Sequence, residues 1–281
     1  MKKLRAFTDF LLFSNIFVAF CAAAITFQTY LIYSFALNKA YILFVFCATL
    51  FLYNFQRLIL APIYVKAPGS VRHSWILEHK KPLILLSCIS ALGMLVSLYY
   101  LGLNLLYTIL PVGIFSSLYF LPGIHLRKIP VLKSLMVAFI WTLVSIFIPV
   151  QLNGNFQMNA SLLLLFAERA FFFLSICVVF NIRDMEHDRL SGVRTIPSVY
   201  GIKTGIAAGL SGIFMAGICS CLLFLQGTYS LTNMLAVVTS LIITFLLIRK
   251  CEIGKSETFY LFGLDGMLPM QLLLVCLFNL L

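Results

Sequence analysis

Apolar residues run in long blocks along almost the whole chain, and short polar stretches separate the blocks. A block of about 20 apolar residues, folded as an α-helix, matches the ~30 Å hydrocarbon layer of a bilayer. The blocks and the charged connections between them predict nine transmembrane helices. The expected ranges are 10–37, 41–63, 82–101, 104–122, 134–150, 160–181, 201–226, 231–249 and 259–280.

The composition agrees with a membrane protein. Of the 281 residues, 62% are hydrophobic and 10% are charged, whereas soluble domains carry about 25% charged residues. The first apolar block is too long for the core of a signal peptide, so we expect it to be retained as a span. No long polar segment interrupts the blocks, and we therefore expect a single all-α domain over residues 1–281.

The positive charges predict an orientation. With nine spans and a cytoplasmic N-terminus, every lysine and arginine except Lys39 and Arg169 falls in or beside a cytoplasmic connection. This bias is the one that the positive-inside rule describes. We therefore expect the N-terminus inside and the C-terminus outside, in a bacterial cytoplasmic membrane. The net charge of +11 then needs no nucleic-acid partner.

The scarce acidic residues are concentrated after one predicted span. The chain has nine acidic residues, and Asp184, Glu186 and Asp188 lie close together in the stretch NIRDMEHDRLSGVRTIP. If the helix continues for two turns, Asn181, Asp184 and Asp188 share one face, and Glu186 points elsewhere. Carboxylates in this arrangement suit Mg²⁺, which takes one or two of them together with water and phosphate oxygens.

Basic side chains surround this acidic cluster. Arg183, Arg189 and Arg194 carry guanidinium groups, whose shape fits phosphate oxygens. Together with an apolar cavity, they indicate a ligand with a diphosphate head and a hydrophobic tail. The alternative is a solvated loop in which the charges neutralise one another. Gly192 and Pro197 favour an ordered return into the membrane, because they fit a turn and a first helical turn.

The stretch RDMEHDRLSGVRTIPSVYG resembles the second aspartate-rich motif of the UbiA-type intramembrane prenyltransferases. It has paired aspartates, then a glycine, a basic residue, Thr-Ile and a second glycine. The resemblance implies nine helices around a central cavity, with Asp184 and Asp188 binding Mg²⁺. It also implies transfer of an isoprenoid chain from a prenyl diphosphate to a hydrophobic, often aromatic, acceptor within the bilayer. The oligomeric state stays open.

The first aspartate-rich motif of that family is degenerate in this chain. We expect it as N-D-x-x-D-x-x-x-D near the end of span 41–63, where the sequence reads YNFQRLILAPIY. Asn54 keeps the asparagine. The three aspartate positions hold Phe55, Leu58 and Pro62. Arg57 can take the place of a metal here, since a fixed positive charge also stabilises a diphosphate leaving group.

Two other connections contain candidate phosphate contacts. The stretch GIHLRKIPVLKS contains Lys128 and Lys133, and the resemblance puts a diphosphate-binding lysine in this region. Arg72, in SVRHSWILEHKK, is a further candidate in a segment that suits an interfacial helix. The two lysines are equally explained as charges that orient the spans.

Ionisable residues also occur inside predicted spans. Glu168 and Arg169 lie near the middle of span 160–181, and Asp265 lies in span 259–280. Such groups are costly at membrane depth and usually face the bundle interior or a cavity. Adjacent residues on a helix point about 100° apart, so Glu168 and Arg169 pair poorly with each other. We therefore expect Arg169 to pair with Asp265.

The sequence therefore predicts a prenyltransferase with Mg²⁺ as its cofactor. The expected catalytic residues are Asp184, Asp188 and Arg57, of which the two aspartates bind the metal. The expected substrate-binding residues are Asn54, Asn181, Arg183, Arg194, Lys133, Arg72 and Lys128. Two alternatives stay open: a cyclase that acts on the isoprenoid diphosphate, and a lipid-binding or transport protein that uses the same cavity without chemistry.

Overall fold

The computed structural model describes residues 2–66, 71–102, 106–120, 131–154, 158–190 and 192–280, and these residues form helices and connecting turns without a β-strand. In chain order the helices are α1 (Lys2–Phe13), α2 (Ile16–Ile32), α3 (Lys39–Lys66), α4 (Val71–Glu78), α5 (Lys80–Leu101), α6 (Leu106–Phe120), α7 (Leu132–Thr142), the π-helix η3 (Leu143–Phe147), α8 (Ile148–Leu152), α9 (Ala160–Arg183), α10 (Met185–Leu190), α11 (Ile196–Tyr200), α12 (Ile202–Leu225), α13 (Leu231–Ile248), the π-helix η4 (Phe259–Leu264) and α14 (Met267–Phe278). The predicted all-α class is confirmed.

Within the described residues, seven helical segments are long and apolar enough to cross a membrane, or eight if the bent pair α1–α2 is one span. They correspond to the predicted ranges to within a few residues at most ends. The range 104–122 corresponds to α6, which has 15 residues. Residues 103–105 and 121–130 at its two ends lie outside the described part, so the count of nine stays a prediction.

The first predicted span, 10–37, is wrong as one continuous helix. α1 and α2 meet at an angle of 63°. The bend falls at Asn15, whose φ of 64° lies in the left-handed region that asparagine tolerates better than most residues. The Asn15 side chain donates a 2.8 Å hydrogen bond to Asn54 Oδ1 in α3. This bond ties the bend to the neighbouring helix.

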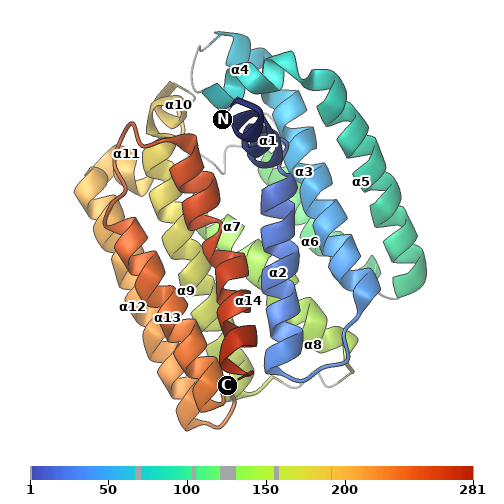
Figure 1. Ribbon diagram of the computed structural model, residues 1–281, viewed down its shortest axis with the longest axis vertical. Helices are drawn as coiled ribbons and strands as arrows, with labels where there is room; N and C mark the ends of the chain where they lie inside the picture. Colours follow the sequence, from blue (N-terminus) through green and yellow to red (C-terminus); the bar gives the residue numbers. More distant parts are fainter. Residues whose placement is uncertain are drawn as a thin grey trace.

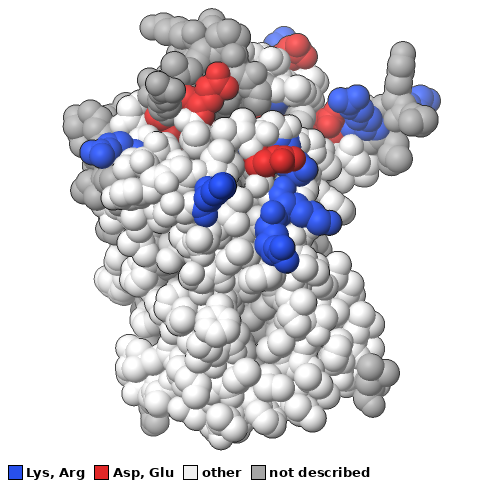
Figure 2. All heavy atoms as spheres, turned by 90° about the vertical axis from the view of Figure 1, so that its left-hand side faces the viewer, with Lys and Arg blue, Asp and Glu red and all other residues white. Residues whose placement is uncertain are grey.

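The long helices form a bundle with its polar connections at one end (Figure 1). α9, α12, α13 and α14 lie on one side, α2, α3 and α5 on the other, and the N-terminus, α4 and α10 share one end, which we call the α10 end. Figure 2 shows one face of the molecule, on which charged side chains gather toward the α10 end and the opposite part is uncharged. A surface of this kind suits contact with lipid.

Close packing of α12 on α9 holds the helix that carries the acidic cluster. A Cβ at Gly209 would lie 2.9 Å from Val179 Cγ1, and a Cβ at Gly212 would collide with Ser175 Oγ, so the two backbones approach as closely as glycine allows. Small residues allow this kind of contact between membrane helices. α9 is thereby held rigidly up to its C-terminal end at Arg183.

Candidate functional site

A cavity of about 700 Å³ lies inside the bundle and is lined mostly by apolar side chains. Phe44, Trp141, Phe173 and Leu268 are among the residues of its apolar wall. A hydrophobic cavity of this size accepts a long hydrocarbon chain or a drug-sized molecule. The central apolar cavity that the resemblance implies is therefore present.

Four basic side chains also line the cavity, and they come from four different helices: Arg57 of α3, Arg72 of α4, Lys133 of α7 and Arg183 of α9. Asp184, directly after α9, lines the cavity as well. In the sequence these residues are up to 127 positions apart, from Arg57 to Asp184. The fold thus collects three arginines and a lysine at one apolar chamber, and we call this group the cationic cluster.

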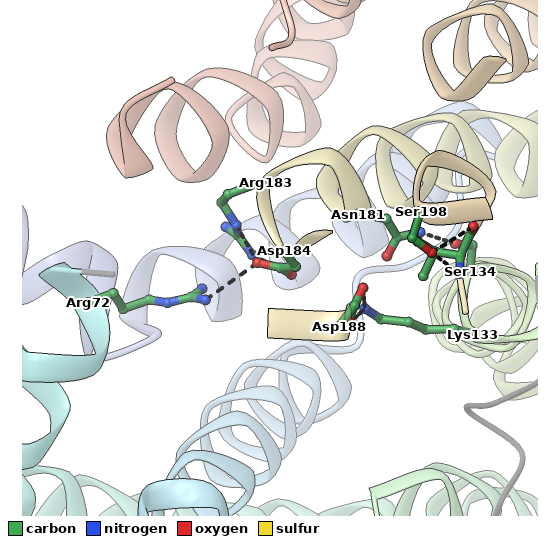
Figure 3. A network of polar contacts seen from close by, with 9 residues as sticks. Arg72, Lys133, Ser134, Asn181, Arg183, Asp184, Asp188 and Ser198 are labelled. Carbon is green, nitrogen blue, oxygen red and sulfur yellow. Dashed lines mark hydrogen bonds and ion pairs between the residues drawn. The ribbon is translucent and has the colours of Figure 1, made fainter. Parts of the chain in front are cut away.

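Asp184 holds two of the arginines in place (Figure 3). Arg183 forms a fork-shaped pair with it, with Nε 2.8 Å from Oδ1 and Nη2 3.0 Å from Oδ2. Arg72 Nη2 lies 3.8 Å from Oδ1. The Arg183 guanidinium also lies over the Phe180 ring, 4.7 Å from its centroid. The carboxylate and the ring fix the direction of the guanidinium group.

Glu257 is a member of the site that the sequence analysis missed. Its Oε2 lies 4.0 Å from Arg72 Nε and 3.6 Å from Arg183 Nη1. These distances are too long for hydrogen bonds, and both nitrogen atoms are buried without a hydrogen-bond partner within the described residues. An incoming anion can therefore accept hydrogen bonds from these two N–H groups, which the protein leaves unused. The only sequence signal for Glu257 was a polar stretch before the last span.

The charges at this site are unevenly compensated. Burial alone raises the pKa of the Asp184 carboxyl, but Arg183, Arg72 and Lys133 outweigh burial and hold its pKa well below the usual range. Burial, together with repulsion from Arg57 and Arg183, lowers the pKa of Arg72 to about 10. Asp184 is therefore a stable anion, whereas the positive charge on Arg72 is not fully neutralised. The cluster favours a further negative charge.

Asp188 is placed differently from Asp184. The helix does not continue unbroken past Asp184, because α9 ends at Arg183 and Asp184 is its C-cap before the short helix α10. Asp188 is buried and is not among the residues that line the cavity. Lys133 Nζ donates to both of its carboxylate oxygens, at 2.9 and 2.8 Å. Figure 3 shows the two aspartates turned toward different partners.

The two predicted asparagines support the site from the sides. Asn181 lines the cavity, and its Nδ2 donates a 2.8 Å hydrogen bond to Ser134 Oγ in α7. Asn54 is fully buried, is not part of the cavity wall, and accepts the hydrogen bond from Asn15. Of this pair, Asn15 is the one that lines the cavity.

Two further predicted residues lie elsewhere. Arg194 is exposed between α10 and α11 and is not among the cavity-lining residues. Lys128 lies outside the described residues. Glu186 is exposed, as expected for a residue that points away from the other two acids.

The expected pair of Arg169 with Asp265 is wrong. Arg169 Nε lies 3.8 Å from Glu168 Oε2, its immediate neighbour, and Nη1 donates to Ile25 O at 3.2 Å. Both residues are fully buried. Asp265 instead lines the cavity.

The carboxylates restrict the number of metal ions that fit. Within the described part of the chain, no group of three His, Cys, Asp or Glu side chains is arranged to hold a metal. Asp184, with a side chain 27% exposed, lines the cavity and has oxygens in reach of a ligand. So small a number of carboxylates fits one Mg²⁺ that takes most of its ligands from water and phosphate. It does not fit two metals on opposite sides of a diphosphate.

Comparison with known proteins gives one family and no close relative. A sequence model of the UbiA prenyltransferase family matches residues 76–264. No curated protein matches the chain.

Three solved structures share the fold at low sequence identity. A UbiA homologue from Archaeoglobus fulgidus bound to GPP and Mg²⁺ is 12% identical, with a TM-score of 0.65 over 97% of this chain and 100% of that one. An apo UbiA homologue from Aeropyrum pernix K1 is 16% identical, with a TM-score of 0.59 over 96% and 98%. A digeranylgeranylglyceryl phosphate synthase is 17% identical, with a TM-score of 0.59 over 99% and 97%.

Proposed function

Because the chain belongs to the UbiA prenyltransferase family, and is an integral membrane protein, we propose that it transfers an isoprenoid chain from a prenyl diphosphate to a hydrophobic acceptor. The observation that carries this proposal is the cationic cluster at an apolar chamber. A prenyl diphosphate has the same division, with a charged head and a hydrocarbon tail. Its head fits the buried N–H donors of Arg72 and Arg183, and its tail fits the apolar wall.

Arginine side chains take over much of the binding of the head group. Arg57 belongs to α3, the helix with the degenerate first motif, and Arg72 belongs to α4; both line the cavity. Their charges stabilise the diphosphate as it leaves, without a metal at that motif. Arg183, at the end of α9, and Lys133, in α7, line the same cavity and add two more positive charges. The apolar wall excludes water from the allylic carbocation that forms when the diphosphate departs.

We further propose that Asp184 and Asp188 hold one Mg²⁺, with Asn181 beside them. When bound, the ion neutralises the diphosphate and strengthens it as a leaving group. In the structure each aspartate is paired with a cation, Asp184 with Arg183 and Asp188 with Lys133. Substrate phosphates are the natural alternative partners for both cations, and their arrival releases carboxylate oxygens.

Diphosphate release tests this function. The purified protein in detergent receives labelled geranyl diphosphate with Mg²⁺ and a panel of phenolic and alcoholic acceptors, and released diphosphate and prenylated product are measured. We expect release by the unaltered protein and a loss of at least 100-fold in Asp184→Ala and in Arg72→Gln. Glu186→Gln is the matched control, because it removes an exposed carboxylate from the same segment.

The outcome also separates the alternatives. Release of diphosphate with formation of a cyclic hydrocarbon supports the cyclase. Tight binding of the donor without release, under all acceptors, overturns the enzymatic proposal and leaves a lipid-binding protein.

A further inference from the structure

Asp265 is a carboxylate in the cavity that neither aspartate-rich motif contains. It follows η4 directly and is the sixth residue after Phe259, where the last span begins. At about 1.5 Å per residue this places it roughly 9 Å along the span from its start. Asp265 therefore lies deeper in the chamber than Asp184, which stands at the end of α9. It lines the same cavity.

The Asp265 carboxylate has no hydrogen bond and no ion pair within the described residues. The positive charges of Arg183 and Arg72 reach it electrostatically, but neither arginine lies within salt-bridge distance. Tyr53, Cys21 and Cys177 also interact with it electrostatically. A carboxylate at membrane depth is costly, and such groups usually face a cavity and serve a function.

The backbone at this point is shaped to present Asp265. The residues before it form a π-helix, a form that occurs mostly as short insertions and often at functional sites. Gly266, directly after Asp265, packs so closely on the carbonyl oxygen of Phe262 that a Cβ would collide with it. A glycine is therefore required for the chain to pass from η4 into α14 in this way. The same local geometry sets the direction of Asp265.

We propose that Asp265 binds the acceptor, accepting a hydrogen bond from an acceptor hydroxyl and taking its proton during transfer. The inference rests on the proposed function and names the acceptor as a hydrophobic alcohol or phenol. In the step, the bond between C1 of the donor and the diphosphate oxygen breaks, and its electron pair leaves with the diphosphate. The acceptor oxygen bonds to C1, and the hydroxyl proton passes to Asp265.

The position of Asp265 agrees with this role. A diphosphate bound by Arg72 and Arg183 directs C1 toward the interior of the chamber, where Asp265 lies. A carboxylate at this place can accept the proton of a hydroxyl group that binds beside it.

Binding of a matched pair of probes tests the acceptor contact directly. We would measure the affinity of 4-butylphenol and 4-butylanisole by titration calorimetry in detergent. The two compounds differ in the hydroxyl hydrogen, which the methyl ether lacks. We expect the phenol to bind the unaltered protein at least tenfold more tightly, as for a hydrogen bond to a charged group. In Asp265→Leu the two probes should bind equally within about twofold.

This measurement does not depend on turnover. A phenol preference that survives in Asp265→Leu, or its absence from the unaltered protein, overturns the proposal. Affinity for geranyl diphosphate serves as the folding control and should stay within about threefold in Asp265→Leu, because Asp265 lies beyond salt-bridge distance of Arg72 and Arg183.

Transfer kinetics test the proton step. With labelled geranyl diphosphate and 4-butylphenol, we expect Asp265→Asn to slow product formation by about 100-fold. Asp265→Glu should recover most of this loss, since it restores the carboxylate one methylene further away. Glu252→Gln is the control, because Glu252 is an exposed carboxylate paired with Lys255 at the surface. An Asp265→Asn variant that transfers at the unaltered rate excludes Asp265 as the base.

If the unaltered protein releases no diphosphate with any acceptor, the proposed function fails. The probe-binding comparison still decides whether Asp265 binds a hydroxyl group.

Discussion

Lys133 Nζ donates hydrogen bonds to both carboxylate oxygens of Asp188, at 2.9 and 2.8 Å, and so joins the start of α7 to α10. The Asp188 side chain is 6% exposed and that of Lys133 is 20% exposed. The pair therefore holds the segment after α9 against the bundle. It also means that the second aspartate of the motif is neutralised by a lysine until a ligand takes that lysine.

Removing Lys133 should destabilise the protein, because it takes away the ammonium group that donates to both oxygens of the buried Asp188 carboxylate. We expect Lys133→Met to lower the free energy of unfolding by about 3 kcal/mol. The double variant Lys133→Met with Asp188→Leu should recover most of that loss, since the buried carboxylate is then removed as well. Denaturant unfolding in detergent measures both. Equal destabilisation of the single and the double variant would show that the pair is not coupled.

Asp184 should contribute stability that depends on pH. Its folded pKa is held well below the usual range, so its contribution is complete above the unfolded pKa of about 3.9 and is lost as pH falls below that value. We expect Asp184→Asn to cost about 2 kcal/mol from pH 8 to pH 5 and the difference to shrink below about pH 4. Thermal unfolding of both proteins across this range measures it. A difference that grows toward low pH would have the opposite sign and contradict the assignment.

Arg72 should favour anion binding and should lower the stability of the ligand-free protein. Its pKa is lowered to about 10, so the folded state disfavours its charge, and this penalty is constant at every pH below about 10. We expect Arg72→Gln to leave the melting temperature of the free protein unchanged or slightly raised. Inorganic diphosphate should stabilise the unaltered protein. Its apparent affinity, read from this stabilisation, should be at least tenfold weaker in Arg72→Gln. Melting curves with increasing diphosphate measure both quantities, and undiminished affinity in the variant would remove Arg72 from the anion site.

Gly266 and Gly263 form a matched pair on the two sides of the turn that presents Asp265. A Cβ at Gly266 would collide with Phe262 O, whereas a Cβ at Gly263 meets nothing within 4 Å. We expect Gly266→Ala to cost about 1–3 kcal/mol of stability and Gly263→Ala to be neutral or stabilising by up to about 1 kcal/mol. Unfolding measurements compare them. Similar effects of the two substitutions would show that the close contact at Gly266 is unimportant.

Much of the architecture follows from local sequence. Long apolar blocks predict membrane helices, because each block satisfies its own backbone hydrogen bonds and matches the bilayer thickness. The predicted ranges 160–181 and 231–249, for example, match Ala160–Arg183 and Leu231–Ile248. The single domain, the ninth span and the orientation stay predictions. The bend at Asn15 has no hydropathy signal, since it depends on one backbone angle and a bond to Asn54.

The candidate site could be predicted only in part. The acidic cluster, the arginines near it and the isolated Asp265 are visible in the sequence because charges are rare in this chain. Their partners are not, since Arg72 and Glu257, for example, are 185 positions apart in the sequence and lie 4.0 Å from each other only in the folded chain. A pair chosen from the sequence alone, Arg169 with Asp265, was wrong.

The sequence by itself determined that the chain is a bundle of membrane helices, that it resembles the UbiA-type prenyltransferases, and that Asp184 and Asp188 form a polar segment at one end. These properties depend on residue type and on spacing along a single helix. Only the tertiary structure decided that Asp184 faces the cavity while Asp188 pairs with Lys133, and that Asp265 faces the chamber. The reason is that the end of α9 at Arg183 and the turn at Gly266 set the directions of these side chains, and the partner and the cavity walls that they meet come from other helices.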